Sequence, residues 1–315
     1  MDRLVPKNTK PKELADASRH LFGAGGKRLR PVLALVSAEA VGGKARDSVE
    51  AAAALEILHT FTLIHDDIMD CDHVRRNVKT VHTVWGEPTA IVAGDALFAK
   101  VFESVAANAK RKKLSAAKTV ALFETVSRAS FEICQGQVLD MAFGGRKRVT
   151  EANYLEMVGA KTAALTEAST KVGAMLGGGN KKQVRALAKY GRLLGIAFQI
   201  QDDVLGITGV QKKFGKPIGS DIQEGKRTLL VVHALKVATQ RQRATLKCAL
   251  GKKDAKKPEV KAAIKVLQKT GSIEYAASMA ERMIENAKKQ LRILKDSESK
   301  EFLIELADFV ITREI

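Results

Sequence analysis

The feature that most restricts the fold is a helical spacing of apolar residues along almost the whole chain. Apolar residues recur three and four positions apart, and only six prolines occur in 315 residues. This period is that of an amphipathic α-helix, whereas a half-buried strand alternates with a period of two. Aromatic residues, which favour sheets, make up only 5% of the chain. The pattern predicts an all-α protein without strands.

We expect one domain over residues 1–315, built from about ten helices. A Gly-rich turn at 177–180 and a long Gly- and Lys-rich loop at 208–226 interrupt the helical pattern. The helices are predicted over 31–40, 48–70, 91–107, 115–142, 153–176, 182–206, 228–249, 258–270, 272–294 and 299–310.

Composition narrows the class of protein. Three cysteines without metal-ligand spacing argue against a disulfide framework, and no apolar run reaches the ~18 residues of a membrane span. We therefore expect a cytoplasmic protein without an integral membrane segment. The net charge of +18 is scattered over predicted helix junctions without interleaved aromatics, so we expect no nucleic-acid partner. A weak attraction to anionic lipid or other polyanions stays open.

Two acidic clusters carry the candidate chemistry. Asp66, Asp67 and Asp70 end a mostly apolar predicted helix, and Asp66 and Asp70 lie one turn apart on one face. Such like charges repel each other unless a hard cation such as Mg²⁺ neutralises them. Asp202 and Asp203 follow a stretch too apolar to be a solvated surface, and carboxylates at the end of a buried helix need partners. The sequence therefore predicts a shared metal site for a polyanionic substrate.

Cations suited to phosphate lie near both clusters. Lys27 and Arg30 follow a glycine pair at a predicted helix start, and Arg75 and Arg76 follow the first acidic cluster. Lys216 and Lys226 follow the second. Arg and Lys hold phosphate groups by charge-assisted hydrogen bonds, so two separate phosphate sites are predicted, one of them bridged by metal.

The motifs resemble those of the trans-prenyl diphosphate synthases of the farnesyl and geranylgeranyl group, most of all the archaeal short-chain type. The resemblance covers about residues 18–228. It rests on GGKRLRP (25–31), HTFTLIHDDIMDCDHVRRN (59–77), TVH (80–82), GDALF (94–98), KTAAL (161–165), FQIQDD (198–203) and GKPIGSDIQEGKRTL (215–229). It implies the isoprenoid synthase fold, an antiparallel helix bundle around a deep central cavity, and a homodimer with 115–142 among the interface helices.

The resemblance also implies roles for single residues. Lys27, Arg30, His59 and Arg76 are expected to hold the diphosphate of isopentenyl diphosphate. The allylic diphosphate is expected to contact Arg75, Lys161, Thr162, Gln199, Lys216 and Lys226. Three Mg²⁺ ions are expected on Asp66, Asp70 and Asp202, with Asp67 and Asp203 in support. Lys161 and Lys226 join the five aspartates as expected catalytic residues.

The implied reaction is head-to-tail condensation of isopentenyl diphosphate with dimethylallyl, geranyl or farnesyl diphosphate. Ionisation of the allylic diphosphate precedes attack by the double bond, and the 208–226 loop is a candidate lid against water. In this family bulky residues before the first acidic motif limit product length. Phe61 and Thr62 hold those positions, which favours geranylgeranyl diphosphate, with farnesyl diphosphate as a second product.

Two positions depart from the common family pattern. Gly206 stands where the second motif usually has Asp, and Asn77 replaces Gly in a predicted turn. Three other classes of protein fit these motifs less well. A class I terpene cyclase would lack the basic GGKRLRP segment, an inactive partner subunit would have lost an acidic pair, and a nucleic-acid binder would leave both pairs unexplained.

Overall fold

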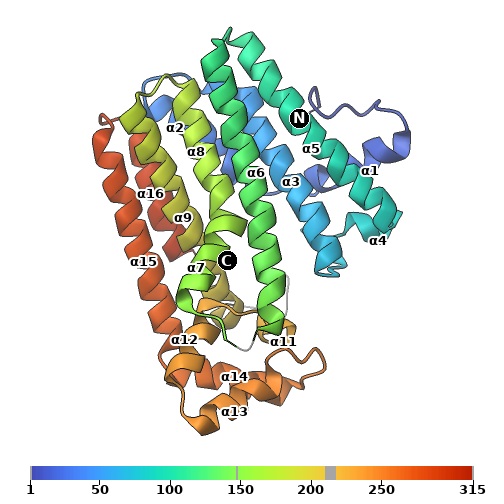
Figure 1. Cartoon of the computed structure of the whole chain (residues 1–315), viewed down its shortest axis with the longest axis vertical. Helices are drawn as coiled ribbons and strands as arrows, with labels where there is room; N and C mark the ends of the chain where they lie inside the picture. The colour runs from blue at the N-terminus through green and yellow to red at the C-terminus, as the bar shows by residue number, and fades with distance from the viewer. Residues whose placement is uncertain (1, 147, 210–217, 314–315) are drawn as a thin grey trace. The chain divides into compact units, whose positions relative to one another are not determined.

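The computed structural model describes residues 2–146, 148–209 and 218–313, and these are almost entirely helical (Figure 1). The all-α prediction is confirmed. Contacts divide the described residues into two compact units. Unit 1 lies within Met1–Ser130, Ala168–Ala188 and Leu294–Lys300, and unit 2 lies within Phe131–Glu167, Lys189–Ile293 and Glu301–Ile315. Among the described residues, four helices contribute to both units: α6 (Ala116–Gly145), α8 (Ala164–Leu176), α9 (Lys181–Thr208) and α16 (Glu298–Thr312).

Unit 1 is centred on α3 (Val49–Met69), which packs against α2 (Leu29–Ala40) and α5 (Glu87–Arg111). The buried side of α3 is apolar, with Leu55, Leu58 and Ile64 almost completely shielded from solvent. Burial of side chains of this kind stabilises a helix by about 1.5–3 kcal/mol each. This unit also contains α1 (Lys12–Gly23), η1 (Ala45–Ser48), β1 (Val74–Arg75), β2 (Val78–Lys79), α4 (Val81–Trp85), the first part of α6, the end of α8 and the first residues of α9 and α16.

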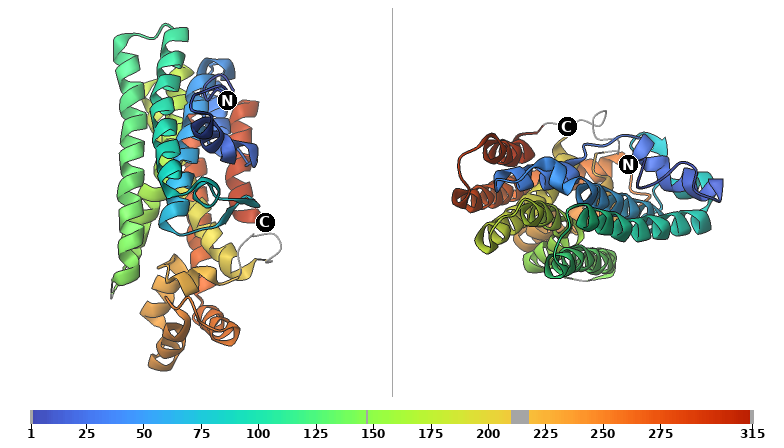
Figure 2. Two further views of the ribbon diagram at one scale, coloured as in Figure 1. Left: turned by 90° about the vertical axis from the view of Figure 1, so that its right-hand side faces the viewer. Right: turned by 90° about the horizontal axis from the view of Figure 1, so that it is seen from above.

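Unit 2 contains the end of α9, which carries the second acidic cluster. In this unit α12 packs on α15, and α13 lies beside α14 (Figure 2). The elements that lie wholly in this unit are α7 (Glu151–Val158), the π-helical turn η2 (Gly159–Ala163), α11 (Ser220–Glu224), α12 (Leu229–Val237), α13 (Gln240–Ala249), α14 (Lys257–Lys269), α15 (Ser272–Gln290) and η3 (Leu291–Ile293). The unit also contains the ends of α6, α9 and α16 and the first residues of α8.

The prediction of no strands was wrong for one short segment. β1 and β2 form an antiparallel hairpin in which Arg75 pairs with Val78. The two residues between the strands, Arg76 and Asn77, have φ angles of 52° and 62°. Two successive positive φ angles define the tight hairpin turn that matches strand twist, and Asn tolerates this conformation better than most residues. Asn77 therefore fits the turn without glycine.

The single helix predicted over 228–249 was also wrong. The backbone is extended at Ala238, and a new helix begins after Thr239. The Thr239 hydroxyl accepts a hydrogen bond from the backbone N–H of Gln242, and the side-chain oxygen of Gln242 accepts one from the backbone N–H of Thr239. This reciprocal arrangement is a capping box, and its sequence pattern is Thr-x-x-Gln. The pattern predicts a helix start at Thr239, whereas the apolar spacing alone predicts one continuous helix. Helix α1 was not predicted, because its apolar positions are few.

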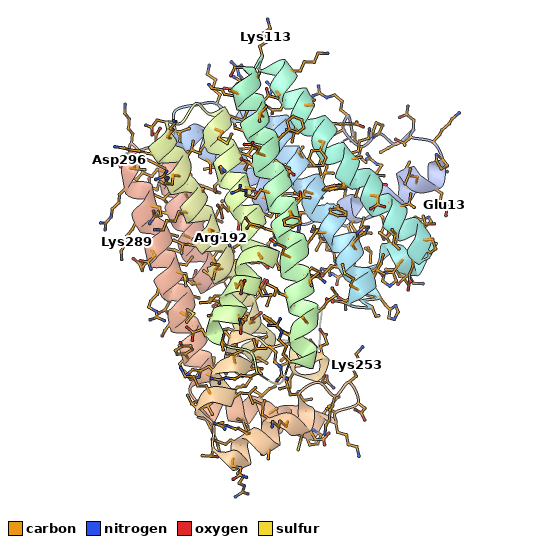
Figure 3. All side chains as sticks on the ribbon, in the orientation of Figure 1. Glu13, Lys113, Arg192, Lys253, Lys289 and Asp296 are labelled. Atoms are coloured by element: carbon orange, nitrogen blue, oxygen red, sulfur yellow. The ribbon has the colours of Figure 1, made fainter. Side chains whose placement is uncertain are left out.

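Part of the loop predicted at 208–226 is helical in the structure. Helix α9 continues to Thr208, and Ser220–Glu224 form α11. Residues 210–217, including Lys216, lie outside the described residues. In the described part of the chain, no helix is both long and apolar enough to cross a bilayer. All three cysteines are free and exposed. Lys113 and Lys253, at helix junctions, extend away from the ribbon (Figure 3).

Candidate active site

In unit 1, helix α3 ends at the first acidic cluster by a tight C-terminal turn. The backbone N–H of Cys71 donates to the carbonyl of Ile68, and that of Asp72 donates to the carbonyl of Asp67. This pair of bonds is a Schellman motif, and Cys71 has the left-handed φ of 56° that the motif requires. The helix ends at Met69 with Asp70 as its C-cap, so Asp66 lies in the last turn of the helix and Asp70 directly after it.

The aspartates of this cluster differ in environment. Asp67 is buried, its side chain only 1% exposed, and it accepts a hydrogen bond from Nε of Arg75. Burial, opposed by the Arg75 guanidinium, raises the pKa of Asp67 to about 6. Asp66 and Asp70 are both half-buried, and Nη2 of Arg75 lies 3.8 Å from Oδ2 of Asp66. The Arg75 guanidinium therefore lies against the acidic cluster.

A cationic group surrounds His59, two turns before the acidic end of α3. Burial and the positive charges of Arg30, Arg76, Arg75 and Arg28 hold the pKa of His59 well below its usual value. The four guanidinium groups therefore lie within electrostatic range of one imidazole, and an anion among them would relieve their mutual repulsion. The structure thus gathers three of the four residues predicted for isopentenyl diphosphate, and the fourth, Lys27, is exposed on the adjoining segment.

Two features of the segment before α2 shape this group. Gly26 has a φ of 130°, and a Cβ there would lie 2.8 Å from the guanidinium carbon of Arg76. Glycine fits here because a φ of 130° is strained for any residue with a Cβ, and the absence of a side chain leaves room for the Arg76 guanidinium. Arg28, which the sequence analysis did not select, pairs with Glu56 and donates to the carbonyl of Phe22 at 2.8 Å. Arg28 has a φ of 51°, and these contacts hold it in that uncommon conformation.

The proposed chain-length residues lie on the same helix as the acidic cluster. The ring centroid of Phe61 is 5.1 Å from that of Phe98 on α5, and Phe98 lies 5.1 Å from Phe102. Phe61 also makes an edge contact with His65, whose Nε2 lies 3.1 Å from the carbonyl oxygen of Ile91. Thr62 instead donates to the carbonyl of His59 on its own helix, at 2.8 Å.

In unit 2, Asp203 is the buried member of the second acidic pair. It accepts hydrogen bonds from Tyr154 at 2.7 Å and from Gln199 at 3.0 Å, and Thr162 donates to Gln199 at 3.0 Å. Burial and the nearby charge of Asp221 raise the pKa of Asp203 to about 7, although both hydrogen bonds oppose the shift. Asp203 therefore anchors a polar network that includes Thr162 and Gln199. Tyr154 was not foreseen from the sequence.

The π-helical turn η2 presents Lys161 and Thr162. Lys161 donates to Oδ2 of Asp140 on α6 at 2.7 Å. A Cβ at Gly136 would lie 2.1 Å from the backbone nitrogen of Lys161, so glycine permits this close packing of α6 on the turn. Single π-helical turns are frequent at functional sites, because they shift the residues after them around the helix axis.

The half-buried member of the second pair, Asp202, contacts a residue near the C-terminus. Nη2 of Arg313 donates to Oδ1 of Asp202 at 2.6 Å and to the carbonyl of Phe198 at 3.1 Å. The Arg313 side chain is only 3% exposed, and its guanidinium lies over the Phe198 ring at 3.9 Å. Arg313 lies 111 positions from Asp202 in the sequence, so no local pattern predicted the contact.

Asp221, on α11, lies beside Gly206, the position where the second motif usually has Asp. A Cβ added at Gly206 would be 3.1 Å from Oδ2 of Asp221. Nζ of Lys226 lies 2.9 Å from Glu224 and 3.6 Å from Asp221. Asp221 therefore supplies a carboxylate near Gly206, and the motif alone does not predict this because Asp221 lies outside it.

The donor atoms fit a hard cation such as Mg²⁺. Each acidic pair has one carboxylate committed to protein partners and leaves Asp66, Asp70 and Asp202 less buried. Within the described ranges no three His, Cys, Asp or Glu side chains form a metal-holding group by themselves. That arrangement suits Mg²⁺, which takes one or two carboxylates and fills its other positions with water and substrate phosphate.

Comparisons with known proteins give one consistent answer. The family model described as polyprenyl synthetase matches residues 11–267. A short chain isoprenyl diphosphate synthase of Methanothermobacter thermautotrophicus is 48% identical over 304 residues, which cover 96% of this chain and 91% of that protein. A geranylfarnesyl diphosphate synthase of Aeropyrum pernix is 41% identical, covering 96% and 95%. The crystal structure of geranylgeranyl pyrophosphate synthetase from Pyrococcus horikoshii matches with a TM-score of 0.93 and 45% identity, covering 99% of this chain and 94% of that one. The chain belongs to the polyprenyl synthetase family.

Proposed function

We propose that the chain is a short-chain trans-prenyl diphosphate synthase. It condenses isopentenyl diphosphate head-to-tail with an allylic diphosphate and forms geranylgeranyl diphosphate as its main product. The observation that carries the proposal is the combination within unit 1 of an acidic helix end and a cluster of arginines around His59. The archaeal relatives are prenyl diphosphate synthases, and they align with this chain over nearly their whole length, which supports the same reaction.

The arginine cluster is proposed to bind isopentenyl diphosphate without metal. Arg30, Arg76 and Lys27 supply charge, and the neutral His59 imidazole can donate one hydrogen bond without adding to the repulsion. Binding of this diphosphate fixes the double bond that attacks the allylic carbon, which removes most of the entropy cost of bringing two substrates together.

The second diphosphate is proposed to lie at the acidic clusters. Asp66, Asp70 and Asp202 would hold Mg²⁺, three ions in all, and the ions would neutralise the diphosphate as it leaves. Thr162, held by Gln199, and Lys161 would contact the same diphosphate, together with Arg75 and Lys226. Lys216 shares this proposed role and lies outside the described residues. Asp67 and Asp203 act by positioning Arg75 and Gln199.

We also propose that residues 1–315 act as one synthase domain and that the protein is a cytoplasmic homodimer. Relatives that align over at least 96% of the chain support one domain. An apolar stripe on α6 supports the dimer, since Phe131, Val138 and Met141 are all more than half exposed. Their spacing of seven and three places them on one face of the helix.

One assay tests the proposed reaction. Labelled isopentenyl diphosphate is incubated with Mg²⁺ and each allylic primer in turn, and the dephosphorylated products are sized. We expect a twenty-carbon alcohol as the main product, loss of product in EDTA, and a fall in kcat of at least about a hundredfold for Asp66→Asn. Cyclic hydrocarbons, or turnover independent of metal, would refute the proposal. A twenty-five-carbon product would leave the reaction in place and change only the assigned length.

A further inference from the structure

A basic cavity lies in unit 2, apart from every residue to which a role has been given above. Its volume is about 1080 Å³, and its walls come from the segment before α7, from α12 and from α13. Five of its lining residues are cations and one is acidic. The cations are Arg148, Arg227, Lys236, Arg243 and Lys247. Ligand cavities in proteins are typically about 300–1,000 Å³, so this one is large enough for a small molecule.

No acidic side chain among the described residues pairs with these cations. The acidic Glu151 instead accepts a hydrogen bond from Tyr275 at 2.6 Å. Nε of Arg227 is buried and has no partner among those residues. Burial also lowers the pKa of the Arg227 guanidinium, as expected for a cation drawn away from water. A bound anion would relieve both the repulsion and the missing hydrogen bond.

Part of the cavity wall is apolar. Val149, Val232, Leu235 and Leu250 line the same cavity. A cavity with apolar walls and an excess of positive charge concentrates the field on its contents, so it attracts a compact anion of several charges more strongly than a flat surface does. Arg and Lys pair best with phosphate and carboxylate oxygens, and five cations match a diphosphate better than a single carboxylate.

We propose that this cavity is a second anion site that binds a diphosphate group, separate from the catalytic diphosphate sites. Two sources share this chemistry: the inorganic diphosphate that the proposed reaction releases, and the head group of a prenyl diphosphate whose tail would lie on the apolar wall. The existence of the site does not depend on the proposed function, but the choice of these two sources does.

The test is equilibrium binding of inorganic diphosphate, without Mg²⁺ and at fixed ionic strength, to three forms of the full chain. They are the wild type, Arg243→Gln/Lys247→Gln, and a matched control, Lys261→Gln/Lys265→Gln, which removes two exposed charges from α14. We expect the cavity variant to lose one equivalent of bound diphosphate, or to bind it about tenfold more weakly, and the control to bind as the wild type does. Equal binding by all three forms would overturn the proposal.

A second arm separates the sources. The same three proteins are titrated with an unreactive prenyl thiodiphosphate. Loss of binding to this analogue in the cavity variant assigns the site to a prenyl diphosphate head group, and loss confined to inorganic diphosphate assigns it to the released ion. Arg148→Gln, in the segment before α7, replaces the double variant if the latter loses its helical circular dichroism. Product formation by the wild type is measured separately, so failure of the cavity site and failure of the proposed synthase reaction are distinguishable.

Discussion

At the scale of single residues, Phe61 meets Phe98 across the interface between α3 and α5. If Phe61 limits the growing chain, its removal opens space at the end of the hydrocarbon site. We predict that Phe61→Ala lengthens the product by at least one isoprene unit, and that Phe61→Ala/Phe98→Ala lengthens it further. Thin-layer separation of the dephosphorylated products measures the change.

The control for this prediction is Phe309→Ala, which removes an exposed ring on α16. This variant should give the wild-type product profile. An unchanged profile for Phe61→Ala would show that Phe61 is an ordinary packing residue of unit 1.

Gly206 offers a second prediction at this scale. Restoring the common family motif with Gly206→Asp would place a carboxylate close to Asp221, because a Cβ there already lies 3.1 Å from Oδ2 of Asp221. Repulsion between such close like charges is about 1 kcal/mol or more, so we predict that kcat/KM falls about tenfold. Gly206→Asn is the control of equal size without charge. Higher activity for Gly206→Asp than for Gly206→Asn would contradict the role given to Asp221.

The contact between Arg313 and Asp202 leads to a third prediction. Arg313 occupies an oxygen of a carboxylate that is proposed to bind Mg²⁺, so cation and arginine compete for it. We predict that Arg313→Met, which retains packing on Phe198, lowers the half-activating Mg²⁺ concentration about threefold to tenfold, as expected for an ion pair worth ~1 kcal/mol. Magnesium titrations of activity measure the shift, with Arg292→Met on η3 as control. A higher magnesium requirement would show that Arg313 assists binding.

At the scale of elements, Thr239 determines where α13 begins. Its hydroxyl and the Gln242 side chain satisfy backbone N–H groups that would otherwise lack partners. We predict that Thr239→Ala lowers the free energy of unfolding by about 1 kcal/mol, measured by urea denaturation. Thr245→Ala, in the middle of α13, should change stability far less, because alanine is favourable within a helix. Equal losses in both variants would mean that the cap does not stabilise the helix.

The π-helical turn shows the limit of prediction for an element. The spacing of apolar residues indicated one helix over 153–176, yet the turn at Gly159–Ala163 shifts Lys161 and Thr162 around the axis. The turn is accommodated because Gly136 and Gly195 allow close approach of neighbouring helices in unit 2. A local period cannot reveal this, since the space at both glycines is set by residues distant in sequence.

At the scale of the whole molecule, the stripe on α6 bears on assembly. We predict that Phe131→Glu/Val138→Glu converts the proposed dimer to a monomer, because two charges on an apolar contact face would remain unpaired on association. Light scattering after size exclusion gives the mass, and Phe302→Glu, an exposed apolar position on α16, is the control. If the double variant remained a dimer, the contact would lie elsewhere on the surface. A monomeric wild type would exclude the proposed dimer.

The sequence alone determined the helical class, the two acidic clusters and the basic segment beside α2, because each is written in local spacing or in a contiguous motif. It also contains the Thr-x-x-Gln pattern that predicts a helix start at Thr239, although the apolar spacing around it indicates a continuous helix. Only the tertiary structure decided which aspartate of each pair is buried, since Arg75 and Tyr154 reach Asp67 and Asp203 from other elements. It likewise decided the Arg313 contact and the basic cavity, because both depend on side chains that approach in space while lying far apart along the chain.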